Sequence, residues 1–112
     1  MDAHKKAELK RAYKQTLPPK GIYKVHTSVT GQTWVDASTN LDSIKNRIWF
    51  SLRLGNHHNK KLQQAWNESG EEAMHYAVVE IFEEEVSGYA LERLLKERKQ
   101  YWLAELQAES CQ

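Results

Sequence analysis

Alternating and helically spaced hydrophobic positions divide this chain into a short series of elements. Residues 20–38, KGIYKVHTSVTGQTWVDAS, place β-branched and aromatic residues on both sides of a polar turn centred on Gly31. This pattern predicts two short strands joined as a hairpin, in which Gly31 takes the positive φ that the connection needs. Tyr23 lies near the start of the first strand.

Two helices, a third strand and a last helix are predicted after the hairpin. Near-helical apolar spacing over residues 41–54, after a capping residue and before Gly55, predicts an amphipathic helix. A second, short helix is expected over residues 60–66. Residues 74–82, MHYAVVEIF, are apolar on both faces, so we expect a central strand that helices cover, between the hairpin strands or against one of them. Residues 89–108 predict a long amphipathic helix.

The N-terminal segment predicts a separate basic helix. Residues 2–16 are rich in alanine, lysine and glutamate, and the prolines Pro18 and Pro19 end the pattern. We therefore divide the chain into a basic helical arm, residues 1–17, and one α+β domain, residues 18–112. The arm either docks on the domain or lies along a phosphate backbone.

Length and composition limit the class of protein. The 112 residues, 40% of them hydrophobic, suffice for one modest core. No run of about 18 apolar residues is present, and the N-terminus is too charged for the apolar region of a signal peptide. We therefore expect a cytoplasmic protein without a membrane span. The lone Cys111 excludes a disulfide framework, and it is expected to be a spare thiol on a frayed tail.

Charge is sorted along the chain although the net charge is only +1. Residues 1–66 carry 12 lysines and arginines against 4 acidic residues, whereas residues 67–112 carry 4 against 11. This distribution is typical of a molecule with one face that attracts phosphate. The alternative is that the two parts interleave in space and neutralise each other.

The segment between the helices predicted over residues 41–54 and 60–66, with the start of the latter helix, offers local phosphate ligands. His57 and His58 precede Lys60 and Lys61 at a helix start. Adjacent histidines diverge there and no carboxylate stands at ligand spacing, so helix capping or nucleic-acid contact is favoured over a metal site. An ordinary solvated helix end remains the alternative.

Several landmarks in order resemble the GIY-YIG endonuclease domain over residues 20–106. They are Gly21-Ile22-Tyr23, Trp34-Val35-Asp36-Ala37-Ser38, the block GNHHNKKLQQAW, a strand ending in VVEIFEE, and Glu97-Arg98 ahead of Tyr101-Trp102-Leu103. The resemblance implies a small three-stranded antiparallel sheet flanked by helices, to which the N-terminal helix is an addition. It also implies an active site on the hairpin, the first helix after it and the last helix.

The resemblance further implies roles for individual residues. Tyr23 matches the first family tyrosine, which activates water or relays its proton, and Glu97 matches the glutamate that holds one divalent ion, Mg²⁺ or Mn²⁺. The second tyrosine is replaced by Trp34, whose indole cannot relay a proton. The usual helix arginine is replaced by Ile44, and Arg47, three residues on, is the substitute that we expect.

One further departure from the family pattern introduces a negative charge. Asp36 replaces the glycine of the second half-motif, and its carboxylate is expected either to recruit a cation or to repel a phosphate.

Two functions therefore remain open. The first is a GIY-YIG nuclease that cleaves DNA phosphodiester bonds with a divalent metal. Its expected residues are Tyr23 and Arg47 for catalysis, Glu97 for the metal, and Lys45, His57, His58, Lys60 and Lys61 for nucleic acid. The second is a degenerate domain that binds nucleic acid or a protein partner without cleavage. Tyr23 and Glu97 in one cleft favour the nuclease, whereas a Glu97 that points to solvent away from Tyr23 counts against it.

Overall fold

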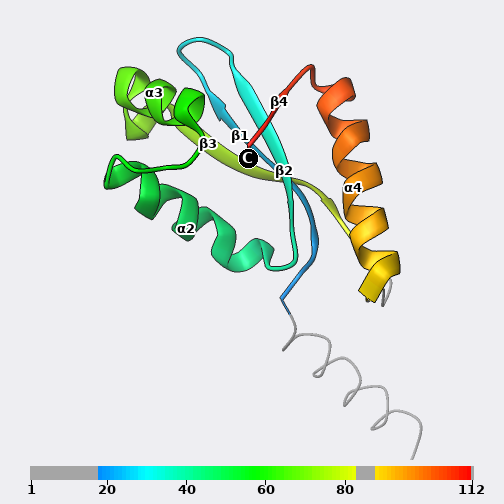
Figure 1. Cartoon of the computed structure of the whole chain (residues 1–112). Coiled ribbons are helices and arrows are strands. Elements are labelled where there is room, and N and C mark those ends of the chain that lie inside the picture. Colours follow the sequence, from blue (N-terminus) through cyan, green and yellow to red (C-terminus); the bar gives the residue numbers. More distant parts are fainter. Residues whose placement is uncertain (1–17, 83–87, 112) are drawn as a thin grey trace, which may run out of the picture.

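The computed structural model describes residues 18–82 and 88–111 (Figure 1). The predicted N-terminal arm and the acidic run at residues 83–85 lie outside these residues. The elements are β1 (Gly21–Thr27), β2 (Thr33–Ser38), α2 (Leu41–Arg53), α3 (Lys60–Ser69), the 3₁₀ turn η1 (Glu71–Ala73), β3 (Met74–Ile81), α4 (Gly88–Glu105) and β4 (Glu109–Ser110). In this part of the chain no helix is both long and apolar enough to cross a membrane.

The predicted hairpin is confirmed. Strands β1 and β2 pair antiparallel, with Tyr23 opposite Asp36. Gly31 has a φ of 77°, and its N–H donates to the carbonyl of Thr27 at 2.9 Å. A side chain at this φ is strained, which explains the glycine at the turn.

The sheet has four strands in the order β3-β1-β2-β4 and is mixed rather than fully antiparallel. Strands β1, β2 and β3 form the expected antiparallel part, whereas β4 pairs parallel to β2. Cys111 extends this pairing, because its N–H donates to the carbonyl of Val35 at 3.0 Å. The prediction of a frayed tail is therefore wrong. A two-residue strand is too short to leave a periodic pattern in the sequence.

Strand β3 lies against one of the hairpin strands, as one of the two expected placements had it, but it is an edge strand and the expectation of a central one is wrong. It pairs with β1 alone, which lies between β3 and β2. Val78 and Ile81 on this strand are consequently 40% and 53% exposed. β3 passes so close to β1 that a Cβ on Gly21 would lie 1.9 Å from the carbonyl oxygen of Glu80. The first glycine of the GIY motif is thus required by strand packing.

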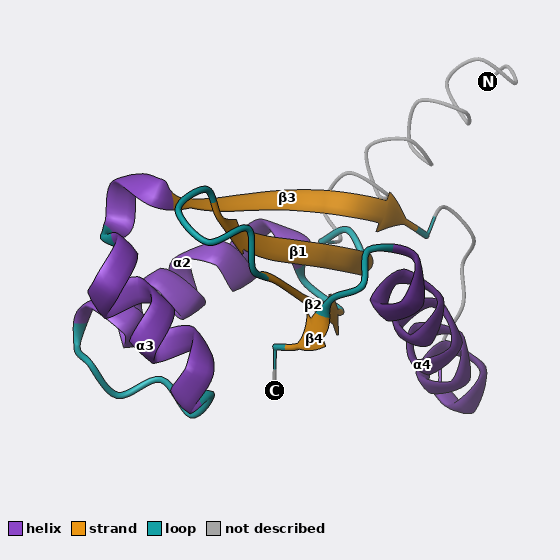
Figure 2. Cartoon of the chain, turned by 90° about the horizontal axis from the view of Figure 1, so that it is seen from above, coloured by secondary structure: helices purple, strands orange, loops and turns teal. Residues whose placement is uncertain are grey.

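The helices cover the sheet from two sides. In Figures 1 and 2, α2 and α3 lie together on one side and α4 lies apart from them. Asn40 caps α2 and Asn59 caps α3, each accepting a bond from a backbone N–H in the first turn. The core beneath α2 and α3 contains three tryptophans, and Trp49 meets Trp66 edge-on at a centroid distance of 5.6 Å.

Candidate functional site

Tyr23 lies inside the core and not on an open surface. Its side chain is 2% exposed, packs 5.6 Å from the ring of Tyr76, and is hydrogen bonded to Cys111. Burial, together with Cys111 and Asp36, raises the pKa of Tyr23 above its ordinary value. The phenol therefore keeps its proton at neutral pH.

Asp36 and Lys99 form an ion pair beside Tyr23. Nζ of Lys99 lies 3.1 Å from Oδ1 of Asp36, and the two side chains are 14% and 12% exposed, respectively. Asp36 also accepts a bond from the N–H of Ala37 at 2.8 Å. The Asp36 carboxylate is thus paired with a cation of the chain itself, and its effect on an external cation or on a phosphate stays a prediction.

Cys111 completes this cluster from β4. It is 3% exposed, and burial raises the pKa of its thiol to about 12. The thiol is therefore protonated and unreactive in the folded state. We call Tyr23, Asp36, Lys99 and Cys111 the tyrosine cluster.

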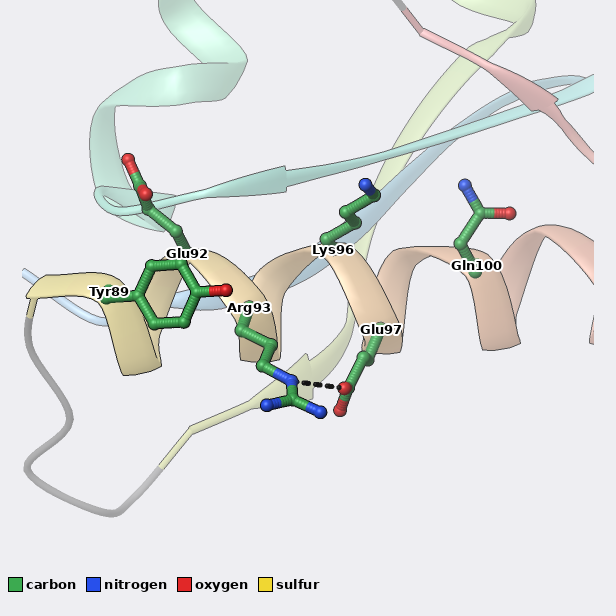
Figure 3. Close-up of a pocket in the computed structure, with 6 residues that line it drawn as sticks. All are labelled: Tyr89, Glu92, Arg93, Lys96, Glu97 and Gln100. Carbon is green, nitrogen blue, oxygen red and sulfur yellow. Dashed lines mark hydrogen bonds and ion pairs between the residues drawn. The ribbon is translucent and has the colours of Figure 1, made fainter.

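Glu97 lies on another face of α4. Its carboxylate is 60% exposed and pairs with Nε of Arg93 at 3.1 Å (Figure 3). The pocket that it lines is formed by Tyr89, Glu92, Arg93, Lys96 and Gln100 and does not include Tyr23. Since successive helix residues are about 100° apart, Glu97 and Lys99 point in widely different directions. The α4 residue at the tyrosine cluster is Lys99, which the sequence prediction missed.

The residues of the cluster do not fit a divalent metal. Within residues 18–82 and 88–111, no group of three histidine, cysteine or acidic side chains is placed to hold one. The Asp36 carboxylate is already paired with an ammonium and the Glu97 carboxylate with a guanidinium. Mg²⁺ is commonly held by one or two carboxylates together with water and substrate phosphates. The described residues therefore offer no preformed site of several protein ligands, and Glu97 remains the single metal ligand that the resemblance implies.

Trp34, at the place of the second family tyrosine, is fully buried in the core. This position supplies packing and no hydroxyl. Ile44, at the place of the helix arginine, shares a pocket of about 310 Å³ with Arg47. The other side chains that line the pocket are Ile48, Ser51, Asn56, His57 and His58. Arg47 thus stands beside the position for which it was the expected substitute.

The two histidines differ in character. His57 is 6% exposed, its Nδ1 accepts the N–H of Asn59 at 3.0 Å, and its ring stacks on His58 at 4.4 Å. Burial, and then the neighbouring His58, lower the pKa of His57. A neutral His57 with Nδ1 as acceptor carries its proton on Nε2. His58 is the exposed member of the pair.

A second pocket, of about 540 Å³, continues from the first. His58 lines both, and here it is joined by Asn59, Lys60, Lys61, Glu109 and Ser110. Nζ of Lys61 lies 3.3 Å from Oε1 of Glu109, with both side chains more than half exposed. Five of the expected residues, Arg47, His57, His58, Lys60 and Lys61, thus share one continuous surface, which we call the basic surface.

Lys45 lies apart from the basic surface. It lines neither of the two pockets, and its Nζ stands 5.5 Å from the ring centroid of Trp49. This cation–π contact holds the lysine along its own helix.

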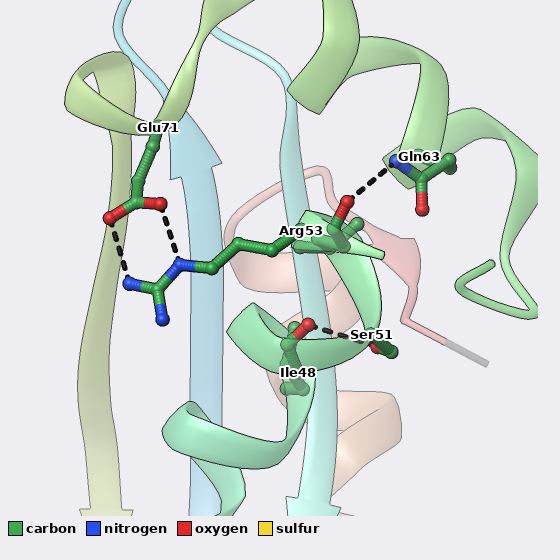
Figure 4. Close-up of polar contacts among 6 residues, drawn as sticks. Ile48, Ser51, Arg53, Gln63 and Glu71 are labelled. Atoms are coloured by element: carbon green, nitrogen blue, oxygen red, sulfur yellow. Dashed lines mark hydrogen bonds and ion pairs between the residues drawn. The ribbon is translucent and has the colours of Figure 1, made fainter. Parts of the chain in front are cut away.

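Gln63 links α3 to the end of α2 and to the backbone of His57, beside the basic surface. Its Nε2 donates to the carbonyl of Leu52 at 3.1 Å (Figure 4). Its Oε1 accepts the N–H of His57 at 3.0 Å. Nearby, Arg53 binds Glu71 through two bonds of 2.8 Å and so joins α2 to η1. Sequence reasoning missed Gln63; its only signal was a polar residue on the apolar side of α3.

Solved structures confirm the fold. The chain is similar to the catalytic domain of the homing endonuclease I-TevI, with 24% identity and a TM-score of 0.65 over 79% of this chain and 88% of that domain. A mutant of the same domain gives 24% identity and a TM-score of 0.67 over 80% and 84% of the two chains. No protein-family model and no curated protein matches the sequence. The GIY-YIG resemblance of the sequence is thus confirmed as a fold.

Proposed function

We propose that this chain is a divergent GIY-YIG domain that binds the DNA backbone through the basic surface without metal-dependent cleavage. The observation that carries this proposal is the separation of the expected residues. Arg47 and the residues from His57 to Lys61 share one surface, whereas Glu97 pairs with Arg93 on a face of α4 that does not adjoin Tyr23.

The basic surface has the chemistry that phosphates require. The Arg47 guanidinium offers a planar fork of donors, and Lys60 adds an exposed point charge. Among the described residues neither forms an ion pair, so neither must break one before it binds. Lys61 is partly offset by Glu109. We therefore expect this surface to contact about three phosphates.

The same geometry disfavours hydrolysis. In-line attack on a phosphodiester needs a base, a Lewis acid and a stabilising cation around one phosphorus. Tyr23 is sealed in the core as a neutral phenol. The carboxylate of Asp36, which lies opposite Tyr23 on β2, is neutralised by Lys99.

Hydrolysis of DNA is the second candidate. The observation in its favour is the likeness to a domain described as catalytic in a homing endonuclease. On this alternative, Glu97 holds Mg²⁺ or Mn²⁺, Tyr23 acts as base or proton relay, and Arg47 is the phosphate cation. No observation favours a protein partner.

Binding and cleavage of one DNA substrate distinguish the candidates. Fluorescence anisotropy with a labelled duplex is expected to give binding in EDTA, weakened about five-fold or more by R47A and by K60A. Lys96, an exposed lysine on α4, provides the matched control, and K96A is expected to bind like wild type. Plasmid DNA with Mg²⁺ or Mn²⁺ is expected to remain intact. Metal-dependent nicking that R47A abolishes would establish the nuclease, and the absence of any binding would reject both candidates.

A further inference from the structure

Two exposed apolar side chains stand beside the basic surface. Phe50 and Leu54 are 64% and 60% exposed, and the N–H of Leu54 donates to the carbonyl of Phe50 at 3.1 Å at the end of α2. Residues four apart on a helix are neighbours, so the two side chains share one exposed face. We call Phe50 and Leu54 the apolar patch.

Arg47 connects the apolar patch to the basic surface. It precedes Phe50 by three residues, which makes the two side chains neighbours on the helix. At about 100° per residue, Arg47 lies between Phe50 on one side and Ser51 on the other. Arg47 and Ser51 line the pocket of about 310 Å³, and so does Asn56, which follows Leu54 by two residues. The apolar patch and the basic surface are therefore continuous.

His58 offers a second planar group on this surface. Its ring stacks on that of His57 with a centroid distance of 4.4 Å and 23° between the planes. His57 is itself buried and fixed, because its N–H donates to Oε1 of Gln63 and its Nδ1 accepts the N–H of Asn59. The exposed ring of His58 thus rests on a fixed ring, and it lines the same pocket as Arg47.

This combination of groups matches an unpaired nucleotide. Aromatic rings and guanidinium planes stack on bases, while cations bind the phosphates of the same strand. In an intact duplex the faces of the bases are covered by their neighbours, so the ring of Phe50 would find no partner there. Arg47 and Lys60 form no ion pair with the described residues, which favours an anionic occupant over an apolar peptide.

We propose that the preferred ligand of the basic surface is single-stranded DNA, whose unpaired bases stack on Phe50 and His58 while its phosphates contact Arg47 and Lys60. Leu54 adds apolar contact beside Phe50. Duplex DNA binds through its phosphates alone and therefore more weakly. The inference rests on the proposed function and names the form of DNA that this surface takes.

Two labelled strands of equal length test the inference by fluorescence anisotropy in EDTA. One is a thymidine strand of about 12 nucleotides, and the other has the same phosphates but abasic sugars at its internal positions. Wild type is expected to bind the intact strand about five-fold or more tightly than the abasic strand, because stacking needs the bases. F50A should reduce this ratio to about two-fold or less, whereas R47A should weaken the binding of both strands.

Two further variants assign the effect to the ring of Phe50. F50W keeps a flat aromatic group and is expected to preserve the ratio. Y89A is the matched control, because Tyr89 is 78% exposed on α4 and lines a pocket that includes no residue of the basic surface. Circular dichroism checks that F50A is folded, and the comparison of the two strands with wild type needs no variant at all.

The outcomes separate this inference from the proposed function. Equal affinities of wild type for the intact and abasic strands, with both weakened by R47A, would overturn the preference for unpaired bases and leave backbone binding in place. A folded F50A with the ratio of wild type would also overturn it. If that F50A instead lost self-association in analytical ultracentrifugation, the apolar patch would belong to a contact with a second copy. Absence of binding to the duplex and to both strands would reject the proposed function as well.

Discussion

Tyr23 keeps the chemistry of a phenol because its surroundings disfavour the phenolate. Burial is the largest cause, and the neighbouring Cys111 and Asp36 act in the same direction. A tyrosine with a pKa raised in this way is a poor general base at neutral pH. Its hydroxyl serves instead as a hydrogen-bond partner of Cys111 in the core.

The variant Y23F is therefore expected to act on stability. Removal of a buried hydrogen-bond partner should lower the free energy of unfolding by about 1 kcal/mol. Urea denaturation measures this change, and DNA affinity is expected to stay within about two-fold of wild type. Y101F is the matched control, because Tyr101 is 46% exposed and its substitution should be nearly neutral. A Y23F protein of unchanged stability that has lost a DNA-cleaving activity would refute this interpretation.

Because of His57 and His26, the protein is expected to lose stability at mildly acidic pH. Burial is the main cause that lowers the pKa of both His57 and His26. Each binds fewer protons when folded than when unfolded, where its pKa is about 6.5. Their stabilisation is therefore full above about pH 6.5 and declines as the pH falls toward the folded pKa values.

Urea denaturation between pH 7.5 and pH 5 checks this expectation. H57Q and H26Q should each flatten part of the profile of unfolding free energy against pH. H58Q serves as the control on the exposed neighbour of His57. A profile that neither H57Q nor H26Q alters would show that other groups cause the pH dependence.

At the scale of elements, the hairpin and the helices were predicted well from local patterns, whereas the full strand order of the sheet was not. The hairpin, α2 and α3 were foreseeable because Gly31, the capping asparagines and the apolar spacing act locally. The edge position of β3 was not foreseeable, because an apolar strand can be covered or left at an edge by distant residues. The pairing of β4 with β2 likewise depends on residues about 75 positions apart.

The residues of the candidate site likewise include some that local sequence predicts and one that it does not. The residues from His57 to Lys61 are close in sequence, so their common surface could be predicted. The partner of Asp36 could not be predicted from the motif order alone, which led to Glu97. The period of α4 does carry the information, because Lys99 lies four residues after Leu95 and three before Trp102 on the half-buried side of this helix.

The docking of β4 makes Cys111 a reporter of local opening. The chain has one cysteine, so the reaction of a thiol reagent reports this strand alone. Burial and the raised pKa of about 12 should slow the reaction about 100-fold or more relative to the protein in denaturant. Stopped-flow absorbance with a chromogenic disulfide measures both rates. Equal rates in buffer and in denaturant would mean that β4 does not stay docked.

At the scale of the whole molecule, part of the charge asymmetry is neutralised internally. Arg53 pairs with Glu71, Lys61 with Glu109 and Lys99 with Asp36, so each pair joins the first 66 residues to the rest of the chain. The interleaving alternative is thus right for these charges. Arg47 and Lys60 form no ion pair with the described residues and remain for an external anion.

The central claim is a nuclease fold that binds DNA without a metal ion, and one salt titration tests it most directly. Anisotropy of a labelled duplex, measured against NaCl in EDTA and again in MnCl₂, should give equal affinities at matched ionic strength. The slope of log K against log salt should be about −3, reduced by about 1 in R47A, with the duplex intact in both series. Affinity that requires Mn²⁺, or a duplex cleaved in the Mn²⁺ series alone, would contradict the account.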